Sequence, residues 1–405
     1  MNPSIEEVLN KTDSSDEQLP QSSEKSHQKI PNILFFFLGN ASLLAYNIAI
    51  NAIDVFSPLF EELNINIGAD ISRAYNIPSS IMSFLLIFFK PTNLRISIST
   101  GLIILILVMC IMPALFAHVN NISTNALYWS TVILLGITGV FSSLVFSSTY
   151  AFASQSGESA GAAVSSGNGA CGVIAAALRI ITKLALSKKS DISSIIYYSV
   201  TAVILVCTLI YFLIISHKNE TVKSHLVTQK SQSMCSKELF HTISIIWVEW
   251  TSVALNFVIT LILFPGYTTD IRQGKLKDWA FVLVTTVFCI FDWVGRYLPA
   301  VKMIPARKFA WIPVTCRLIF FLIFMVSIQG VVNLGEPYWT ICWQMPFALT
   351  NGYCGTVSLI YGSNHEQCSM EQRKQASFLI SFAINAGILL AMFLTYVMPA
   401  GKHLE

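Results

Sequence analysis

Charged residues are scarce in this chain: Asp, Glu, Lys and Arg make up 12% of its 405 residues, against 54% hydrophobic residues. Soluble domains carry about 25% charged residues, so a water-soluble fold of this length would lack the charge to cover its surface. The charges are also clumped, and long apolar runs separate them. This pattern is typical of a polytopic membrane protein and excludes an ordinary soluble domain.

Other absences exclude further classes of protein. A net charge of only +3 gives no basis for binding nucleic acid. The nine cysteines form no C-x-x-C pair, so neither structural disulfides nor a zinc site is expected. The chain also lacks a P-loop and an H-E-x-x-H motif, and its seven histidines lie at span ends, in loops or in tails. We therefore expect no enzyme, no ATP-driven pump, no cofactor and no metal.

Eleven apolar segments are predicted to form membrane helices, because most approach the roughly 20 residues that cross the hydrocarbon core. They lie at about 31–53, 75–90, 95–117, 126–151, 160–184, 193–216, 241–265, 279–303, 308–329, 337–361 and 375–399. The start of the second segment is the least defined, because the residues before it are polar.

The polar segments divide these helices into two groups. Residues 1–30 are predicted to be a disordered cytoplasmic tail. Residues 217–240 form the longest polar loop and are interpreted as a cytoplasmic linker. On this view residues 31–216 are an N-terminal six-helix bundle, and residues 241–405 are a C-terminal five-helix bundle with a short tail. With the N-terminus inside, fourteen Lys and Arg lie in cytoplasmic segments and eight in outer ones. This asymmetry predicts a cytoplasmic N-terminus and an outer C-terminus.

Residues 167–172, Gly-Asn-Gly-Ala-Cys-Gly, are a literal G-x-G-x-x-G, the fingerprint of dinucleotide-binding folds. That fingerprint requires a preceding strand within a soluble unit. Here it lies in a run of Gly, Ala and Ser that leads into an apolar segment. Small residues of this kind are typical of close contacts between membrane helices. We therefore interpret the stretch as helix packing, which can also border a substrate cavity.

Two charges in the stretch FDWVGRYLP, Asp292 and Arg296, lie within the eighth predicted span. They are four residues apart and share one helix face. An unpaired charge near the bilayer centre costs several kcal/mol, and pairing lowers that cost. Two interpretations stay open: an ion pair that only locks the helix in place, or a polar patch that faces a water-filled cavity. Intramembrane charges usually mark substrate or ion paths, which favours the second.

Three other intramembrane charges give weaker signals. Glu249 lies between two tryptophans near the predicted cytoplasmic end of its span, and we expect it to snorkel to the interface. Arg179 lies near an outer helix end and is expected at the interface as well. Arg317 lies deeper, where it could bind Asp292 or a gate partner, or have a purely structural role.

The sequence resembles the equilibrative nucleoside transporter family over most of residues 31–399. FDWVGRYLP is similar to the helix-eight phrase of that family, in which Asp and Arg lie four apart. The other similar phrases are GNGACG in helix five, LFPG (263–266) in helix seven, RLIF (317–320) in helix nine and TNGY (350–353) in helix ten. The resemblance implies an all-α, major facilitator-like fold of eleven helices in a 6+5 arrangement. It also implies facilitated diffusion of nucleosides, or of nucleobases, by alternating access.

The resemblance further implies a substrate site. Asp292 and Arg296 would contact the ribose, and Tyr46 would contribute to the base pocket in place of the helix-one tryptophan of the family. The predicted substrate-binding set is Leu43, Tyr46, Asn47, Phe146, Phe264, Asp292, Arg296 and Asn351. Phe146 is a departure, since many members have a base-reading glutamine there. Ser142, Ser143, Ser147, Ser148 and Tyr150 are the possible substitutes in helix four.

Two alternatives stay open: a carrier of another small polar metabolite such as a sugar, and a proton-coupled symporter. Asp292 and Glu249 are the titratable groups that could carry a proton, although Arg296 would tend to hold Asp292 ionised. The expected partners are a nucleoside and the lipid bilayer, without nucleic acid. We expect a monomer in the plasma membrane, with an internal membrane as the alternative.

Overall fold

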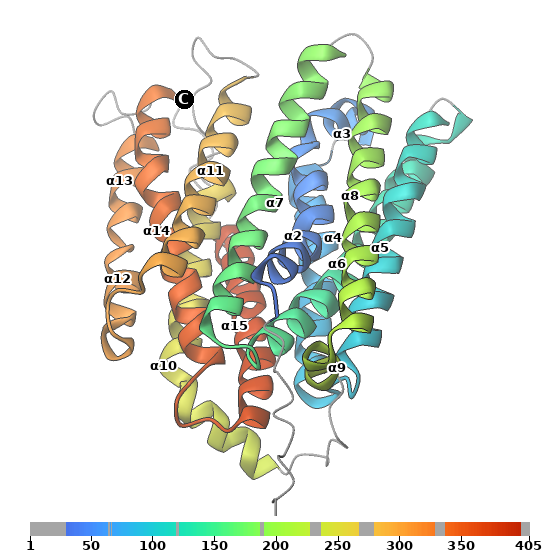
Figure 1. The fold of residues 1–405 in the computed structure, drawn as a ribbon. Coiled ribbons are helices and arrows are strands. Elements are labelled where there is room, and N and C mark those ends of the chain that lie inside the picture. The colour runs from blue at the N-terminus through green and yellow to red at the C-terminus, as the bar shows by residue number, and fades with distance from the viewer. Residues whose placement is uncertain are drawn as a thin grey trace, which may run out of the picture.

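The computed structural model describes residues 30–63, 65, 67–118, 121–186, 190–226, 236–266, 279–328 and 337–397. Helices account for almost all of this described part, which contains no strand (Figure 1). Eight of its helices are long and apolar enough to cross a membrane. The molecule is therefore an all-helical, multi-pass membrane protein, as its composition predicts. The predicted tail at residues 1–30 lies almost entirely outside the described residues.

Every predicted span corresponds to helix in the described residues. The first group comprises α2 (Asn32–Asn51), α3 (Ile53–Leu59), α4 (Ile67–Phe88), α5 (Leu94–Ala117), α6 (Thr124–Ala153), α7 (Glu158–Ala185), α8 (Ser190–Lys218) and α9 (Glu220–Leu226). The second comprises α10 (Ser236–Leu261), α11 (Trp279–Val301), α12 (Trp311–Cys316), α13 (Ile319–Ile328), α14 (Pro337–Ser363) and α15 (Met370–Val397). A π-helical turn, η3 (Ile262–Gly266), ends α10, and the 3₁₀ turn η6 (Arg307–Phe309) precedes α12.

Three boundaries differ from the sequence prediction. α4 begins at Ile67, eight residues before the predicted start, because the residues before that start also pack inside the protein: Ile67 and Ile71 are both buried. The linker predicted at 217–240 contains the helix α9, and α10 begins at Ser236. The ninth span is two short helices, because the backbone tightens around Arg317 into bonds between residues three apart.

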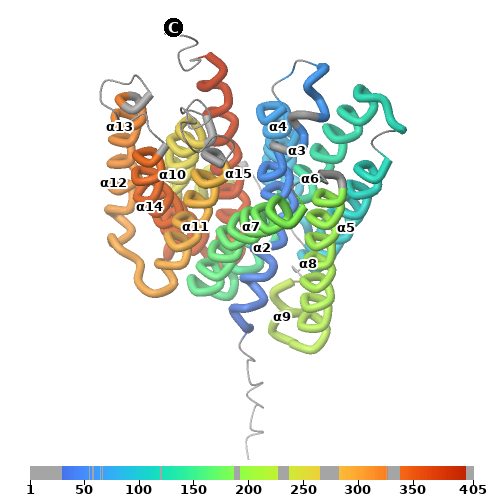
Figure 2. Tube along the Cα trace, turned by 90° about the horizontal axis from the view of Figure 1, so that it is seen from above, coloured from blue at the N-terminus to red at the C-terminus, as the bar shows by residue number. Residues whose placement is uncertain are grey.

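The two groups of helices lie side by side, with α7 and α15 between them (Figure 2). α7 packs against α2 of its own group and against α11 of the other, and α15 packs against both α10 and α4. In Figure 1, α9 and the α14–α15 loop lie at the lower end of the bundle, and α3 lies at the upper end. The start of α7 is at the lower end, since the Gln155 amide donates to the His225 carbonyl of α9.

Hydrogen bonds cross between the two groups at two levels. In the lower part, the hydroxyl oxygens of Ser165 on α7 and Thr356 on α14 are 2.5 Å apart. Nearer the middle, Ser79 Oγ on α4 donates to Asn385 Oδ1 on α15 at 3.1 Å. The groups are thus in polar contact from the middle of the bundle towards its lower end.

Glycines bring helix backbones into contact within each group. A Cβ added at Gly167 of α7 would collide with the carbonyl oxygen of Phe36 on α2, and one at Gly39 would collide with Val164. In the second group, Gly295 of α11 and Gly352 of α14 make the same kind of contact with each other's helix. The interpretation of the glycine-rich stretch as helix packing is confirmed: it lies inside α7, and the helix α6 precedes it instead of a strand.

Candidate substrate site

Asp292 and Arg296 form an ion pair in the middle of α11. Arg296 Nε donates to Asp292 Oδ2 at 2.7 Å, and the two side chains are 15% and 9% exposed. The spacing of four residues on a helix places them on one face, as predicted. The buried charges are therefore paired, which is the condition for holding them at membrane depth.

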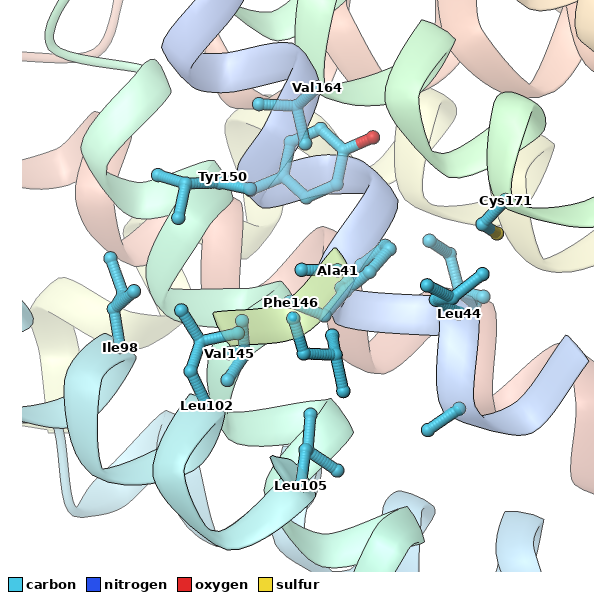
Figure 3. Packing of buried hydrophobic residues seen from close by; sticks show 14 of the residues in the cluster. Ala41, Leu44, Ile98, Leu102, Leu105, Val145, Phe146, Tyr150, Val164 and Cys171 are labelled. Carbon is cyan, nitrogen blue, oxygen red and sulfur yellow. The ribbon is translucent and has the colours of Figure 1, made fainter. Parts of the chain in front are cut away.

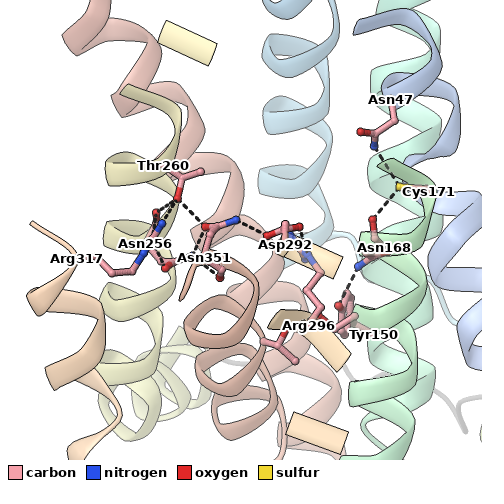
Figure 4. Close-up of polar contacts among 12 residues, drawn as sticks. Asn47, Tyr150, Asn168, Cys171, Asn256, Thr260, Asp292, Arg296, Arg317 and Asn351 are labelled. Carbon is pink, nitrogen blue, oxygen red and sulfur yellow. Dashed lines mark hydrogen bonds and ion pairs between the residues drawn. The ribbon is translucent and has the colours of Figure 1, made fainter. Parts of the chain in front are cut away.

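Asn351 of α14 binds the other oxygen of the same carboxylate. Its Nδ2 donates to Asp292 Oδ1 at 2.6 Å, and it is almost fully buried. The contact is possible because the glycine pair Gly295 and Gly352 lets α11 and α14 approach at this level. Of the predicted site residues, Asp292, Arg296 and Asn351 are thus joined by direct hydrogen bonds (Figure 4).

Behind Asn351 lies a group of side chains from α10 and the α12–α13 break. Asn256 Nδ2 and Thr260 Oγ1 both donate to Asn351 Oδ1, at 2.9 and 2.6 Å. Arg317 donates in turn to Asn256 Oδ1 and to Thr260 Oγ1. Arg317 therefore does not bind Asp292 directly, which was one of the possibilities that the sequence left open. It reaches that residue through two layers of neutral side chains.

The side of the site on the first helical group is neutral. Asn47 Nδ2 of α2 donates to the Cys171 thiol of α7 at 3.1 Å, and Cys171 Sγ donates to the Asn168 carbonyl. Asn168 Nδ2 donates to the hydroxyl of Tyr150 on α6 at 2.9 Å. Figure 4 shows this chain of contacts facing the Asp292–Arg296 pair.

The two sides meet at the small residues of α7. A Cβ at Gly169 would lie 2.8 Å from Arg296 Cδ and 2.9 Å from Trp293 Cα, so α11 lies directly on this glycine. One turn along, Gly172 borders both Asn47 of α2 and Cys289 of α11. The glycine-rich stretch thus serves two helix contacts, one on each of its faces.

Aromatic rings lie on both sides. Tyr46 is stacked on Tyr75 of α4, with ring centroids 4.1 Å apart. Phe264 is stacked in the same way on Phe288, which lies one turn before Asp292 on α11. The backbone of Phe264 is extended inside the π-turn, with φ −136° and ψ 125°. The ring therefore turns back towards α11 instead of continuing the direction of α10.

Phe146 belongs to the main apolar core, and Leu43 packs against it. Phe146 is 7% exposed, and its ring lies 4.8 Å from that of Tyr150. Figure 3 shows it among core side chains that include Ala41, Leu44 and Val145. Leu43 is half-buried against the same cluster, and its carbonyl accepts a hydrogen bond from Asn47. Phe146 reaches the polar contacts of α7 through Tyr150.

The structure corrects two predictions about charges. Glu249 does not snorkel: it is 4% exposed, and its carboxylate lies 3.7 Å from Arg307 Nε. Arg179 is 7% exposed and donates to Ser193 on α8, so it packs inside the first group instead of lying at the interface. In both cases a polar side chain from another part of the chain is the partner of the charged group, in place of the water at the membrane surface that the sequence predicted.

Several contributors were not predicted from the sequence. Asn256 and Thr260 lie four apart on α10, a polar pair in an apolar helix that could have indicated a buried face. Tyr75 is the first residue of the second predicted span, but it was not included among the predicted site residues. Asn168 and Cys171 are the polar residues between the glycines of residues 167–172, where the glycine spacing is the stronger sequence signal.

One further motif of the chain is associated with catalysis in other proteins. Residues Gly157–Gly161 read G-x-S-x-G, but they follow the helix α6 and open α7, so they do not form the strand-to-helix elbow of a serine hydrolase. Among the residues that the structure describes, no three His, Cys, Asp or Glu side chains are grouped to hold a metal ion. The arrangement is suited to binding a polar ligand between two helical groups.

The sequence matches a family model and several relatives that are nucleoside or nucleotide transporters. The family model described as "Nucleoside transporter" matches residues 130–238 and 218–400. The chain is 26% identical over 392 residues to equilibrative nucleotide transporter 1 of Arabidopsis thaliana, covering 91% of this chain and 84% of that protein. It is also 28% identical over 165 residues to human equilibrative nucleoside transporter 4, covering 39% of this chain and 31% of that protein.

Solved structures of major facilitator superfamily transporters share the fold. The transporter FucP in its outward conformation matches with a TM-score of 0.59 at 16% identity, over 91% of this chain and 92% of FucP. The proton:xylose symporter XylE matches with a TM-score of 0.62 at 11% identity, over 91% of this chain and 88% of XylE. At these identities the likeness concerns the fold alone.

Proposed function

The chain belongs to the nucleoside transporter family, and on that premise we propose that it carries nucleosides across a membrane by facilitated diffusion, binding the ribose at Asp292 and Arg296. The family match, the relatives and the major facilitator fold support nucleoside transport.

The buried ion pair is the observation that carries the ribose assignment. Each Asp292 oxygen accepts one hydrogen bond, from Arg296 or from Asn351, and a carboxylate oxygen has room for a second. Arg296 uses Nε for Asp292 and has two further nitrogens that can donate. Vicinal ribose hydroxyls both donate and accept, so they complement an acceptor and a donor that lie side by side.

We assign the base to the aromatic and neutral surfaces on either side of this pair. Tyr46 on its Tyr75 platform and Phe264 on its Phe288 platform offer flat faces on which a heterocycle can stack. Asn47 and Phe146, with Leu43 beside them, complete the side on the first helical group. Phe146 offers no amide, so reading of the base edge falls to neighbouring hydroxyl and amide groups.

Alternating access is the mechanism that this architecture supports. We infer eleven spans in a 6+5 arrangement, a cytoplasmic N-terminus and an outer C-terminus, so that the lower end of the bundle is cytoplasmic. The contact of Ser165 with Thr356 then closes the cytoplasmic path below the site, and the contact of Ser79 with Asn385 joins the two groups near the middle of the bundle. Movement of the two bundles about the site opens this path and closes the other. We assign a monomer in the plasma membrane.

Uptake into proteoliposomes tests the function. Purified protein is reconstituted, and radiolabelled adenosine, inosine, uridine and hypoxanthine are supplied with no gradient other than that of the substrate. Saturable equilibration of a nucleoside is the expected result. If folded protein equilibrates none of them, and an imposed pH gradient drives accumulation, the carrier is a proton-coupled symporter. If neither condition gives uptake, the proposed function is wrong.

A further inference from the structure

Arg317 is a buried cation whose surroundings are neutral. It is 2% exposed, at the break between α12 and α13. Among the described residues, its guanidinium donates only to oxygens of Asn256, Thr260, Thr350 and the Phe347 carbonyl. The Phe347 ring lies 5.1 Å from its central carbon. Burial of a guanidinium without a carboxylate in contact is costly, so the position calls for an explanation.

A guanidinium can only donate hydrogen bonds. Arg317 therefore fixes the direction of the amide hydrogen bonds from Asn256 to Asn351 and from Asn351 to Asp292. Because Arg317 donates to Asn256 Oδ1, the amide of Asn256 must present its NH₂ group to Asn351. Thr260 Oγ1 accepts from Arg317, and its single proton has two acceptors within reach, Asn351 Oδ1 at 2.6 Å and the Asn256 carbonyl at 2.8 Å. The Asn256 amide, assisted by the Thr260 hydroxyl, thus donates to the Asn351 amide oxygen.

The orientation of Asn351 follows from these hydrogen bonds. With its oxygen occupied by Asn256 and Thr260, its NH₂ group faces Asp292 and donates to Oδ1 at 2.6 Å. The reverse orientation would set the NH₂ group of Asn351 against the NH₂ group of Asn256, and its amide oxygen against the Asp292 carboxylate. Figure 4 shows the whole series from Arg317 through Asn351 to Asp292.

We propose that Arg317 is a positioning residue for substrate binding: it orients Asn351 through Asn256 and Thr260, and so fixes the Asp292 carboxylate for the ribose. Asp292 is then held from two sides, by Arg296 directly and by Arg317 through three neutral side chains. This inference rests on the proposed binding of ribose at Asp292. The competing explanation is that Arg317 only stabilises the packing of α10, α13 and α14.

The first test compares Arg317→Gln with Arg179→Gln, which alters a buried arginine of the other helical group. Loss of a hydrogen-bond series that ends on a charged group is expected to raise the KM for adenosine about tenfold or more, and that for adenine or hypoxanthine about threefold at most. Arg179→Gln is expected to leave the ratio of riboside to nucleobase KM unchanged. Equal rises for ribosides and bases in Arg317→Gln, with normal melting temperature, would overturn the proposal.

Asn256→Asp separates positioning from packing even if Arg317→Gln does not fold. The new carboxylate keeps the acceptor for Arg317 and adds an ion pair, so a purely structural role predicts equal or higher thermal stability and an unchanged riboside KM. The positioning role predicts a raised riboside KM in a stable protein, because the amide donor to Asn351 is lost. An unchanged riboside KM in stable Asn256→Asp protein contradicts the proposal.

A double variant provides the final check. Once Asn351→Ala has cut the series, adding Arg317→Gln is expected to change the riboside KM less than about twofold, since coupled residues are non-additive. Multiplication of the two single effects would show that Arg317 acts independently of Asn351. Failure of the inference is distinct from failure of the proposed function, because the latter abolishes nucleoside uptake by the unaltered protein.

Discussion

The two sides of the site use the same packing device but different chemistry. On the first helical group, Gly39 and Gly167 join α2 to α7; on the second, Gly295 and Gly352 join α11 to α14. The side chains that these contacts present are neutral on α2 and α7, where Asn47 binds a thiol. On α11 and α14 they are charged or bound to charges. Close helix contact therefore does not decide which chemistry a site performs.

The difference shows how a membrane protein confines its costly groups. Asp292, Arg296 and Arg317 lie in one connected set of hydrogen bonds. Arg296 binds Asp292 directly, and Arg317 is connected to it through Thr260 and Asn351. The opposite side presents neutral polar side chains, which cost less than charges at membrane depth: Asn47, Tyr150, Asn168 and Cys171. A charged surface for the sugar, flanked by neutral and aromatic surfaces for the base, is an arrangement that suits a nucleoside.

Asp292→Asn removes the centre of the charged side and is expected to have the largest effect. It leaves the Arg296 guanidinium buried without its charged partner, which costs about 3–5 kcal/mol of folding stability. It also replaces the charged acceptor for the ribose hydroxyls with a neutral one, so riboside uptake by the folded protein should fall by about 100-fold. Uptake of free nucleobases should fall less, because they lack the ribose. Equal loss for both substrates, in protein that folds and inserts normally, would refute the ribose role.

Alanine substitutions at the paired glycines test the close helix contacts that both sides of the site share. Gly167→Ala and Gly295→Ala should each destabilise the protein by about 1–3 kcal/mol through overpacking, seen as a lower melting temperature in detergent. Gly136→Ala is the control, because its new methyl carbon would lie 3.7 Å from the nearest atom. A melting temperature for Gly167→Ala equal to that of Gly136→Ala would mean that α2 and α7 are not in contact.

Phe146→Gln adds an amide to the neutral side. The ratio of adenosine to uridine uptake should change about tenfold, because a polar group that must be satisfied discriminates between bases more strongly than an apolar one. Phe146→Leu, which adds no polar atom, should preserve the ratio. If Phe146→Gln also preserves it within twofold, Phe146 does not contact the base.

Asn47→Ala should have the smallest effect, although Asn47 and Asn351 are both asparagines of the predicted site. The bond that Asn47 makes to Cys171 uses a weak sulfur partner, and a neutral hydrogen bond contributes about 1 kcal/mol. We expect the adenosine KM to rise less than about threefold, against a larger rise for Asn351→Ala. A larger effect at Asn47 would show that the neutral side also binds substrate by hydrogen bonds.

Strong local patterns in the sequence were sufficient for much of the fold. The eleven apolar segments all correspond to helix, and the four-residue spacing of Asp292 and Arg296 predicted their pairing. The first eight residues of α4 were missed because charged and polar residues are interspersed among them, although Ile67 and Ile71 anchor them inside the protein. Hydropathy depends on the residues of a segment and does not include the helices packed against it. Glu249 was misplaced for the same reason, since Arg307 lies 58 positions away in the chain.

By itself, the sequence determined that the chain is a multi-pass helical protein, where its helices lie, and that charges four residues apart share a face, because hydropathy and helical period are local properties. Only the tertiary structure decided which helices touch through their glycines and that Arg317 reaches Asp292 through Asn256, Thr260 and Asn351. Those contacts join residues far apart in the chain. Their geometry depends on how close helix backbones approach and on which end of each amide faces a donor, and neither is encoded at any single position.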